Sequence, residues 1–259
     1  MDLVVLFAKN YPSFLFVLVR TGSIIMAAPI FGAFSVPMRI KAGLSLMVAV
    51  LLTPLAPKVP VPVDLVSIAI GVGGEALIGA AIGLAARFIF TGIEYAGQLA
   101  SFQIGIGMAS TFDPIHGAQV TVIGRMMGIL AILVFLSVNG HLMVIMAIKK
   151  SFDVIPPYGF NLSAGLMEHL VLFSKETFLL AVKFSAPVIA VLVFVNIALG
   201  IMARTVPQLN MFAIGFAVTN AVGFIMLAFS MPVIAPAVSA AFDRMWEAIF
   251  GMMGAMGNA

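Results

Sequence analysis

Residues 184–203, FSAPVIAVLVFVNIALGIMA, carry no formal charge over 20 positions. A helix that spans a bilayer needs about 20 consecutive apolar residues, because every backbone N–H and C=O must be bonded within the lipid. Residues 126–148 run 23 positions without a charge, and residues 205–242 run 38. These three segments predict an integral membrane protein built from α-helices.

The composition of the whole chain favours the same class. Hydrophobic residues make up 63% of the 259 residues and charged residues 9%, against roughly 45–50% and 25% in an ordinary soluble domain. The net charge of +3 comes from dispersed lysines and arginines, of which only Lys149 and Lys150 are adjacent, so no basic stripe indicates nucleic-acid binding. Cysteine is absent, which excludes disulfides and thiolate chemistry.

Proline and glycine set the expected helix boundaries. We expect an all-α, hydrophobic, membrane-associated protein with Pro/Gly-broken helices, organised as a single domain over residues 1–259. About six hydrophobic helices are expected, with a separate and more polar helix over residues 158–183. Residues 205–242 are expected to hold one span with irregular flanks, because Pro207, Pro232 and Pro236 interrupt them.

A stripe of charged and small residues runs through one apolar segment. Glu75, Gly79, Gly83 and Arg87 recur every four residues, and Glu94 follows seven residues later on nearly the same helical face. An ionisable group in such a segment is costly unless it is paired or faces water. One hypothesis is a proton or ion relay. The favoured one is a buried helix interface in which Glu75 pairs with an arginine of a neighbouring helix, since glycines at this spacing allow close packing.

Residues 103–119, QIGIGMASTFDPIHGAQ, form a glycine-bearing loop between two helical regions. Irregular backbone at membrane depth is tolerated inside protein or beside an aqueous cavity, while a plain surface loop is the alternative. The residues themselves leave both possibilities open.

Enzyme chemistry lacks a recognisable motif. The three histidines, His116, His141 and His169, lie far apart in sequence and have no acidic co-ligand at metal spacing. Walker, HExxH and GxSxG motifs do not occur in the sequence. We therefore expect no catalytic residues, no metal site and no cofactor.

Residues 203–212, ARTVPQLNMF, followed by Gly215 and Phe216, resemble the ARxxPQxNxF…GF signature of the FliR/SctT family of flagellar and virulence type III secretion proteins. The resemblance covers nearly the whole chain. Further positions that carry it are Arg20, Pro29, Pro37, Arg39, Gly74, Glu75, Gly79, Gly83 and residues 97–114.

The resemblance implies a non-enzymatic subunit of an export gate through which unfolded substrates leave the cytoplasm. It implies FliP- and FliQ-type partners, an FlhB-type partner, contact with membrane lipid, and a fold like that of a fused FliP-FliQ subunit. The PQLN residues favour the flagellar system, in the bacterial inner membrane at the flagellar basal body. The alternative is a stand-alone secondary transporter that binds a small solute or protons at Glu75, Arg87 and Glu94.

Two sets of residues receive candidate roles on this basis. The resemblance implies that the glycine-bearing loop closes the export channel as a plug, through Gly105, Gly107, Met108, Phe112, Asp113, Pro114 and Gly117. The signature is interpreted as an assembly hinge, because a proline breaks a helix and the neighbouring polar side chains can bind freed carbonyls or a carboxylate. Its residues are Arg204, Pro207, Gln208 and Asn210. The alternative for Arg204 is an interfacial side chain that reaches lipid headgroups.

Overall fold

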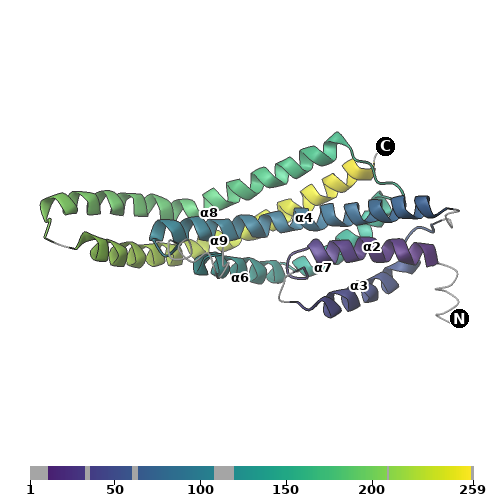
Figure 1. The fold of residues 1–259 in the computed structure, drawn as a ribbon, viewed down its shortest axis with the longest axis horizontal. Helices are drawn as coiled ribbons and strands as arrows, with labels where there is room; N and C mark the ends of the chain where they lie inside the picture. The colour runs from purple at the N-terminus through teal and green to yellow at the C-terminus, as the bar shows by residue number, and fades with distance from the viewer. Residues whose placement is uncertain (1–10, 33–35, 60–63, 108–119, 209, 258–259) are drawn as a thin grey trace. The chain divides into compact units, whose positions relative to one another are not determined.

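The computed structural model describes residues 11–32, 36–59, 64–107, 120–208 and 210–257 (Figure 1). Its elements, in chain order, are α2 (Tyr11–Ala27), α3 (Met38–Leu52), the 3₁₀ helix η1 (Thr53–Leu55), α4 (Leu65–Ile104), α6 (Val122–Ser137), α7 (Gly140–Val154), α8 (Ala164–Thr205) and α9 (Met211–Gly257). No strand occurs within the described ranges. The expected all-α class is confirmed.

Four segments are long and apolar enough to cross a membrane, judged by length and composition. They are Met38–Leu55, Leu65–Ile104, Ala164–Thr205 and Phe212–Gly257. Helices α6 and α7 make a fifth candidate if they count as one broken span. The chain is therefore a membrane protein, as its composition predicts.

The uncharged stretch of residues 126–148 is not one helix. It breaks between α6 and α7 at Asn139, whose backbone is left-handed with φ 57° and ψ 30°. Asparagine tolerates this conformation better than most residues with a side chain, and one such residue ends the helical path. The span-length stretch that the sequence predicts here is therefore divided between two helices, which together still pass as one broken span.

The prolines at 187, 232 and 236 lie inside continuous helices, so the expected irregular flanks around Pro232 and Pro236 were also wrong. An interior proline removes one backbone hydrogen bond. Ending the helix in apolar surroundings would instead leave up to four carbonyls without partners. Continuing the helix through the proline therefore loses fewer backbone hydrogen bonds than ending it there.

The separate polar helix expected over residues 158–183 does not form either. Helix α8 begins at Ala164 and continues through the uncharged segment to Thr205. The Ser163 hydroxyl accepts a hydrogen bond from the Leu166 N–H at 3.2 Å, which caps the start of α8. Charged residues such as Lys175 and Glu176 are good helix formers, so they change the polarity of α8 without ending it.

Asp64 caps the start of α4 outside the apolar segment. Its carboxylate accepts hydrogen bonds from the Ser67 N–H at 3.0 Å and the Ser67 hydroxyl at 2.7 Å. These bonds, with the side-chain bond contributing most, hold the pKa of Asp64 below its usual value. Because the folded pKa is depressed, the stability that this cap contributes is fully present above the ordinary aspartate pKa and is lost as the pH falls from there through the lower, folded pKa.

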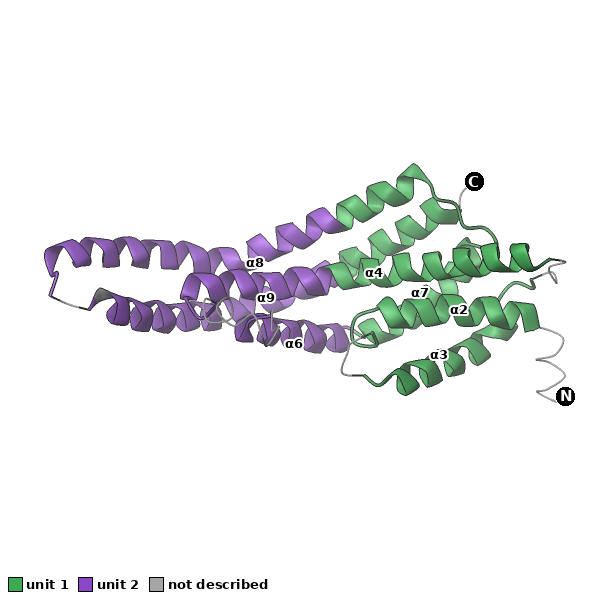
Figure 2. Ribbon diagram, in the orientation of Figure 1, with its two compact units in different colours: residues 1–88, 139–173, 243–259 green, residues 89–138, 174–242 purple. Residues whose placement is uncertain are grey.

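The chain divides into two compact units, coloured separately in Figure 2, and α4, α8 and α9 contribute residues to both. One unit comprises residues 1–88, 139–173 and 243–259. Within it α2 contacts α3 and α7, and its core contains Phe16, Ile78, Ile148 and Met252. The Ser163 hydroxyl also donates to the Ala255 carbonyl at 2.7 Å, which joins the start of α8 to the end of α9.

The second unit comprises residues 89–138 and 174–242. Three buried phenylalanines, Phe90, Phe135 and Phe242, meet at its core with ring centroids 5.0–5.3 Å apart. These edge and tilted arrangements are the favoured geometries for aromatic rings. They join α4, α6 and α9 within this unit.

Candidate functional site

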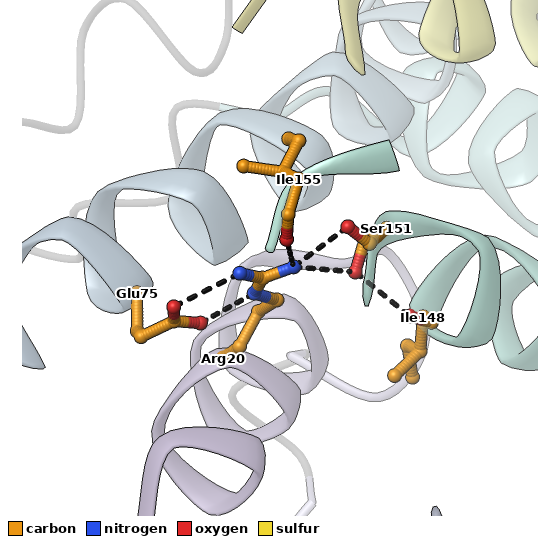
Figure 3. Close-up of polar contacts among 5 residues, drawn as sticks. All are labelled: Arg20, Glu75, Ile148, Ser151 and Ile155. Atoms are coloured by element: carbon orange, nitrogen blue, oxygen red, sulfur yellow. Dashed lines mark hydrogen bonds and ion pairs between the residues drawn. The ribbon is translucent and has the colours of Figure 1, made fainter. Parts of the chain in front are cut away.

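A buried ion pair lies in the first unit, between Arg20 of α2 and Glu75 of α4 (Figure 3). The Arg20 Nε is 2.5 Å from Glu75 Oε2, and Nη2 is 2.9 Å from Oε1. Both side chains are almost fully buried, at 0% and 1% exposure. The two parallel bonds form the bidentate geometry that makes arginine the preferred partner of a buried carboxylate.

The remaining guanidinium nitrogen binds the end of a third helix. Arg20 Nη1 donates to the carbonyl of Ser151 at 2.7 Å and to that of Ile155 at 2.9 Å, at the C-terminal end of α7 (Figure 3). The Phe152 ring covers the guanidinium carbon at 4.1 Å from its centroid. The last carbonyls of a helix have no partners within it and carry partial negative charge. The buried guanidinium of Arg20 therefore donates hydrogen bonds both to the Glu75 carboxylate and to the carbonyls at the end of α7.

Two glycines bring α4 close enough to α2 for this pairing. A Cβ at Gly79 would lie 2.6 Å from the Arg20 carbonyl oxygen, and one at Gly83 would lie 2.5 Å from the Ala27 Cβ. Any larger residue would force the backbones apart. The expected pairing of Glu75 with an arginine is present, and Gly79 and Gly83 lie at the α2–α4 contact.

The other two residues of the predicted stripe lie elsewhere. Arg87 is exposed, and Glu94 lies in the second unit against α6, where a Cβ at Gly128 would be 2.8 Å from Glu94 Oε1. One turn further along α4, a Cβ at Gly97 would be 2.7 Å from the Gly124 Cα. The stripe therefore does not form one site. Besides its glycine contact with α2, helix α4 makes a glycine contact with α6, which the sequence analysis did not predict.

The end of α4 is held against α9. The Thr219 hydroxyl donates to the Ile104 carbonyl at 3.1 Å, and Gly223 leaves room for the Ile104 side chain, which a Cβ there would meet at 2.5 Å. Gly105 follows with φ 103°, a conformation that favours glycine. Helix α4 therefore stops where the sequence predicts the glycine-bearing loop to begin.

On the far side of that loop, the Thr121 hydroxyl accepts from the Gly124 N–H at 3.1 Å and caps α6. Gly105 and Gly107 of the predicted plug are within the described residues. Met108, Phe112, Asp113, Pro114 and Gly117 lie outside them. One end of the loop is thus set by Ile104 of α4, which is bonded to Thr219, and the other by the Thr121 cap of α6.

Of the signature residues that the structure describes, Arg204 lies at the end of α8 and Pro207, Gln208 and Asn210 lie between α8 and α9. Helix α8 ends at Thr205, two residues before Pro207, since a residue that precedes proline disfavours the helical conformation. The Met202 carbonyl accepts from the Val206 N–H at 2.9 Å and the Thr205 hydroxyl at 3.1 Å. Asn210 accepts from the Ala213 N–H at 3.3 Å, so it caps α9. Arg204, Pro207 and Gln208 are exposed.

Metal chemistry receives no support from the described residues, which contain no group of three or more histidine, aspartate or glutamate side chains placed to hold an ion. His141 and His169 are within the described ranges and His116 lies outside them. The arrangement in Figure 3 is a hydrogen-bond network in which Arg20 joins α2 to α4 and α7.

Comparison with known proteins gives consistent matches over most of the chain. Residues 11–245 match the family described as bacterial export proteins, family 1. The flagellar biosynthetic protein FliR of Escherichia coli K12 is 34% identical over 231 residues, which are 89% of this chain and 88% of that protein. The protein of the same name in Bacillus subtilis 168 is 34% identical over 251 residues, 95% and 96% of the two chains.

Removing Arg20 should destabilise the protein far more than neutralising Glu75. We expect Arg20→Met to lower the free energy of unfolding by about 3–5 kcal/mol, because it leaves a buried carboxylate without a partner. Glu75→Gln should cost less, and Arg20→Met combined with Glu75→Gln should recover part of the loss. Thermal unfolding of the purified chain in detergent measures this, with Lys58→Met at an exposed lysine as the control.

The same variants separate packing from a relay. Glu75→Gln should preserve most of the transport activity of cells that carry it, because an amide can still accept hydrogen bonds from Arg20. Complete loss of transport by a Glu75→Gln protein that folds normally would establish the relay instead.

Proposed function

The chain belongs to the bacterial export proteins, family 1, and on that premise we propose that it is a non-enzymatic subunit of a flagellar protein export gate. The observation that carries this proposal is 34% identity to two proteins named flagellar biosynthetic protein FliR, over nearly the full length of each. The match over residues 11–245 also supports treating the chain as a single functional domain, although its contacts cluster into two units.

The buried network supports a structural role for the charges of this chain. All three guanidinium nitrogens of Arg20 donate to Glu75 or to the end of α7. A carboxylate used in this way is an anchor between helices, whereas a stand-alone transporter needs a carboxylate that exchanges a proton or an ion. The transporter hypothesis is therefore not favoured.

The proposed setting is the bacterial inner membrane at the flagellar basal body. The proposed partners are FliP- and FliQ-type subunits and an FlhB-type subunit, and the cargo is unfolded export substrate. Exposed apolar side chains support such partners or lipid. On α8 and α9 they include Phe194 at 73% exposure and Phe212 at 88%, and apolar surface of this extent marks an interaction site.

The glycine-bearing loop is proposed as the plug of the channel. Gly105 follows α4 with a positive φ, and the sequence predicts that Pro114 disfavours a regular helix through Asp113. Met108 and Phe112 are the proposed sealing side chains, because flexible or aromatic apolar groups close a pore by dewetting and still yield to a passing chain.

Deleting the gene for this chain should abolish flagellar assembly and the export of flagellar subunits in the cell that encodes it. A tagged copy should restore export and should co-purify in detergent with several small hydrophobic membrane proteins. Immunoblots of the culture medium and sizing of the purified complex measure the two results. Normal export without the chain, or a lone monomer that transports a solute, would overturn the proposal.

Arg204→Ala should lower the yield of the assembled complex several-fold, because the exposed guanidinium beside Pro207 is proposed to contact another subunit. Arg204→Lys keeps the charge without the planar fork, so an intermediate yield is expected. Arg125→Ala, at another exposed arginine, is the matched control. A complex that assembles normally with Arg204→Ala and yet exports nothing would show that the side chain acts in transport itself.

Deleting residues 108–117 should make cells leak small ions while the complex still assembles, because the contacts of Ile104 and Thr121 that flank the loop remain. Met108→Ser combined with Phe112→Ser tests the seal at full chain length. The control is Leu65→Ser combined with Leu162→Ser, at two exposed leucines outside the loop. Unchanged ion permeability in assembled deletion complexes would contradict the plug.

A further inference from the structure

A groove runs between α2 and α3 in the first unit. Its volume is about 530 Å³, within the range of roughly 300–1,000 Å³ that is typical of small-molecule sites. Its lining consists of Leu18, Val19, Gly22, Ser23, Met26, Ala42, Gly43, Ser45 and Leu46. None of these residues carries a charge, so the groove suits an apolar guest.

The groove is open because small residues face it on both helices. On α3 a Cβ at Gly43 would meet no atom within 4 Å, and on α2 a Cβ at Gly22 would touch Ser45 only at 4.0 Å. The Ser45 hydroxyl already donates to the Lys41 carbonyl at 2.8 Å. The Ser45 hydroxyl proton is therefore used within α3 and does not donate to a bound ligand.

A positive charge lies on α3 one helical turn before the residues that line this groove. Arg39 precedes Ala42 and Gly43 by three and four residues, which places it on the same face of α3 one turn away. The side chain is exposed, and no described residue forms an ion pair or hydrogen bond with its guanidinium. Lys41, the other cation nearby, donates to the Gly32 carbonyl at 3.1 Å. Within the described ranges, Arg39 is therefore the cation next to the α3 part of the groove whose side chain has no ion pair or hydrogen bond.

The surroundings of α3 indicate what such a groove meets. Residues Met38–Leu55 are a candidate membrane span, and Ile40, Met47 and Leu51 are 56–64% exposed on α3. A phospholipid has long apolar chains and one charged headgroup, which matches an uncharged groove with the guanidinium of Arg39 one helical turn away. Cations near a membrane surface attract anionic headgroups.

We propose that the α2–α3 groove binds an acyl chain of an anionic phospholipid, with Arg39 paired to the headgroup phosphate. A helix of another protein laid into the groove is the alternative occupant, and the variants below distinguish it from lipid. The lipid site is independent of the export function proposed above, so failure of either leaves the other intact.

Native mass spectrometry of the full chain in detergent tests the proposal. The probes are phosphatidylglycerol and phosphatidylcholine with identical acyl chains, added together in equal amounts. The wild-type chain should retain phosphatidylglycerol preferentially. Arg39→Gln should reduce that preference about fivefold, because one basic residue near a membrane surface contributes about 1 kcal/mol. Lys58→Gln, at an exposed lysine outside the groove, should leave it unchanged.

A bulky side chain placed in the groove tests whether the acyl chain of the lipid binds there. Gly43→Phe should remove retention of both lipids, because its ring occupies open space in the groove. Gly73→Phe, at a helical glycine of α4 whose Cβ would also meet nothing, should retain them. Circular dichroism and sizing establish that each variant folds, and Gly43→Leu replaces Gly43→Phe if the larger residue prevents folding.

Three outcomes overturn the proposal. Unchanged phosphatidylglycerol retention by folded Gly43→Phe or Gly43→Leu shows that the lipid binds elsewhere. An unchanged lipid preference in Arg39→Gln shows that the guanidinium does not bind the phosphate. Loss of co-purifying membrane proteins from Gly43→Phe, with lipid retention intact, identifies the groove as a protein interface.

Discussion

The buried pair of Arg20 and Glu75 constrains the first unit more than any other contact that the structure shows. Neither charge is exposed to water, so each depends on the other and on the α7 carbonyls for its stabilisation. The geometry fixes α2, α4 and α7 against one another, because a shift of one residue along any of these helices would separate the bonded atoms. Apolar side chains alone would tolerate more than one register, since their contacts are not directional.

The glycines of α4 follow from this constraint. The bidentate bonds require the α2 and α4 backbones to lie close together, and Gly79 and Gly83 are the positions where a side chain would collide with α2. The second unit shows the same relation between α4 and α6, where Gly97 faces the Gly124 backbone. A 40-residue helix thus uses glycines at separate places along its length to approach different partners.

The sequence predicts the class of this protein but not the course of its helices. Length and hydropathy are enough to predict the all-α class, because in lipid a long apolar segment satisfies its backbone hydrogen bonds by forming a helix. They do not locate the break at Asn139, which depends on one left-handed residue, or the continuity of α9 through Pro232 and Pro236. The first depends on the backbone conformation of one residue and the second on how many backbone hydrogen bonds a helix end would lose, and hydropathy measures neither.

The candidate site was predictable to a similar extent. The cost of a lone carboxylate in an apolar stripe is sufficient to predict that Glu75 has a cationic partner. It does not identify Arg20, which lies 55 residues away, or the carbonyls of Ser151 and Ile155. The helical period placed Arg87 and Glu94 on the same face as Glu75, but a helix as long as α4 passes several neighbours, so residues on one face meet different surroundings.

Helix ends show how so apolar a chain satisfies its backbone. The last carbonyls of a helix lack partners within it, and in lipid water cannot replace them. Here Arg20 binds the end of α7, Thr219 binds the Ile104 carbonyl at the end of α4, and Thr205 binds the end of α8. Polar side chains are few, and those at these positions serve the backbone. Side chains used in this way hold helices in place, which suits a structural subunit of a protein export apparatus.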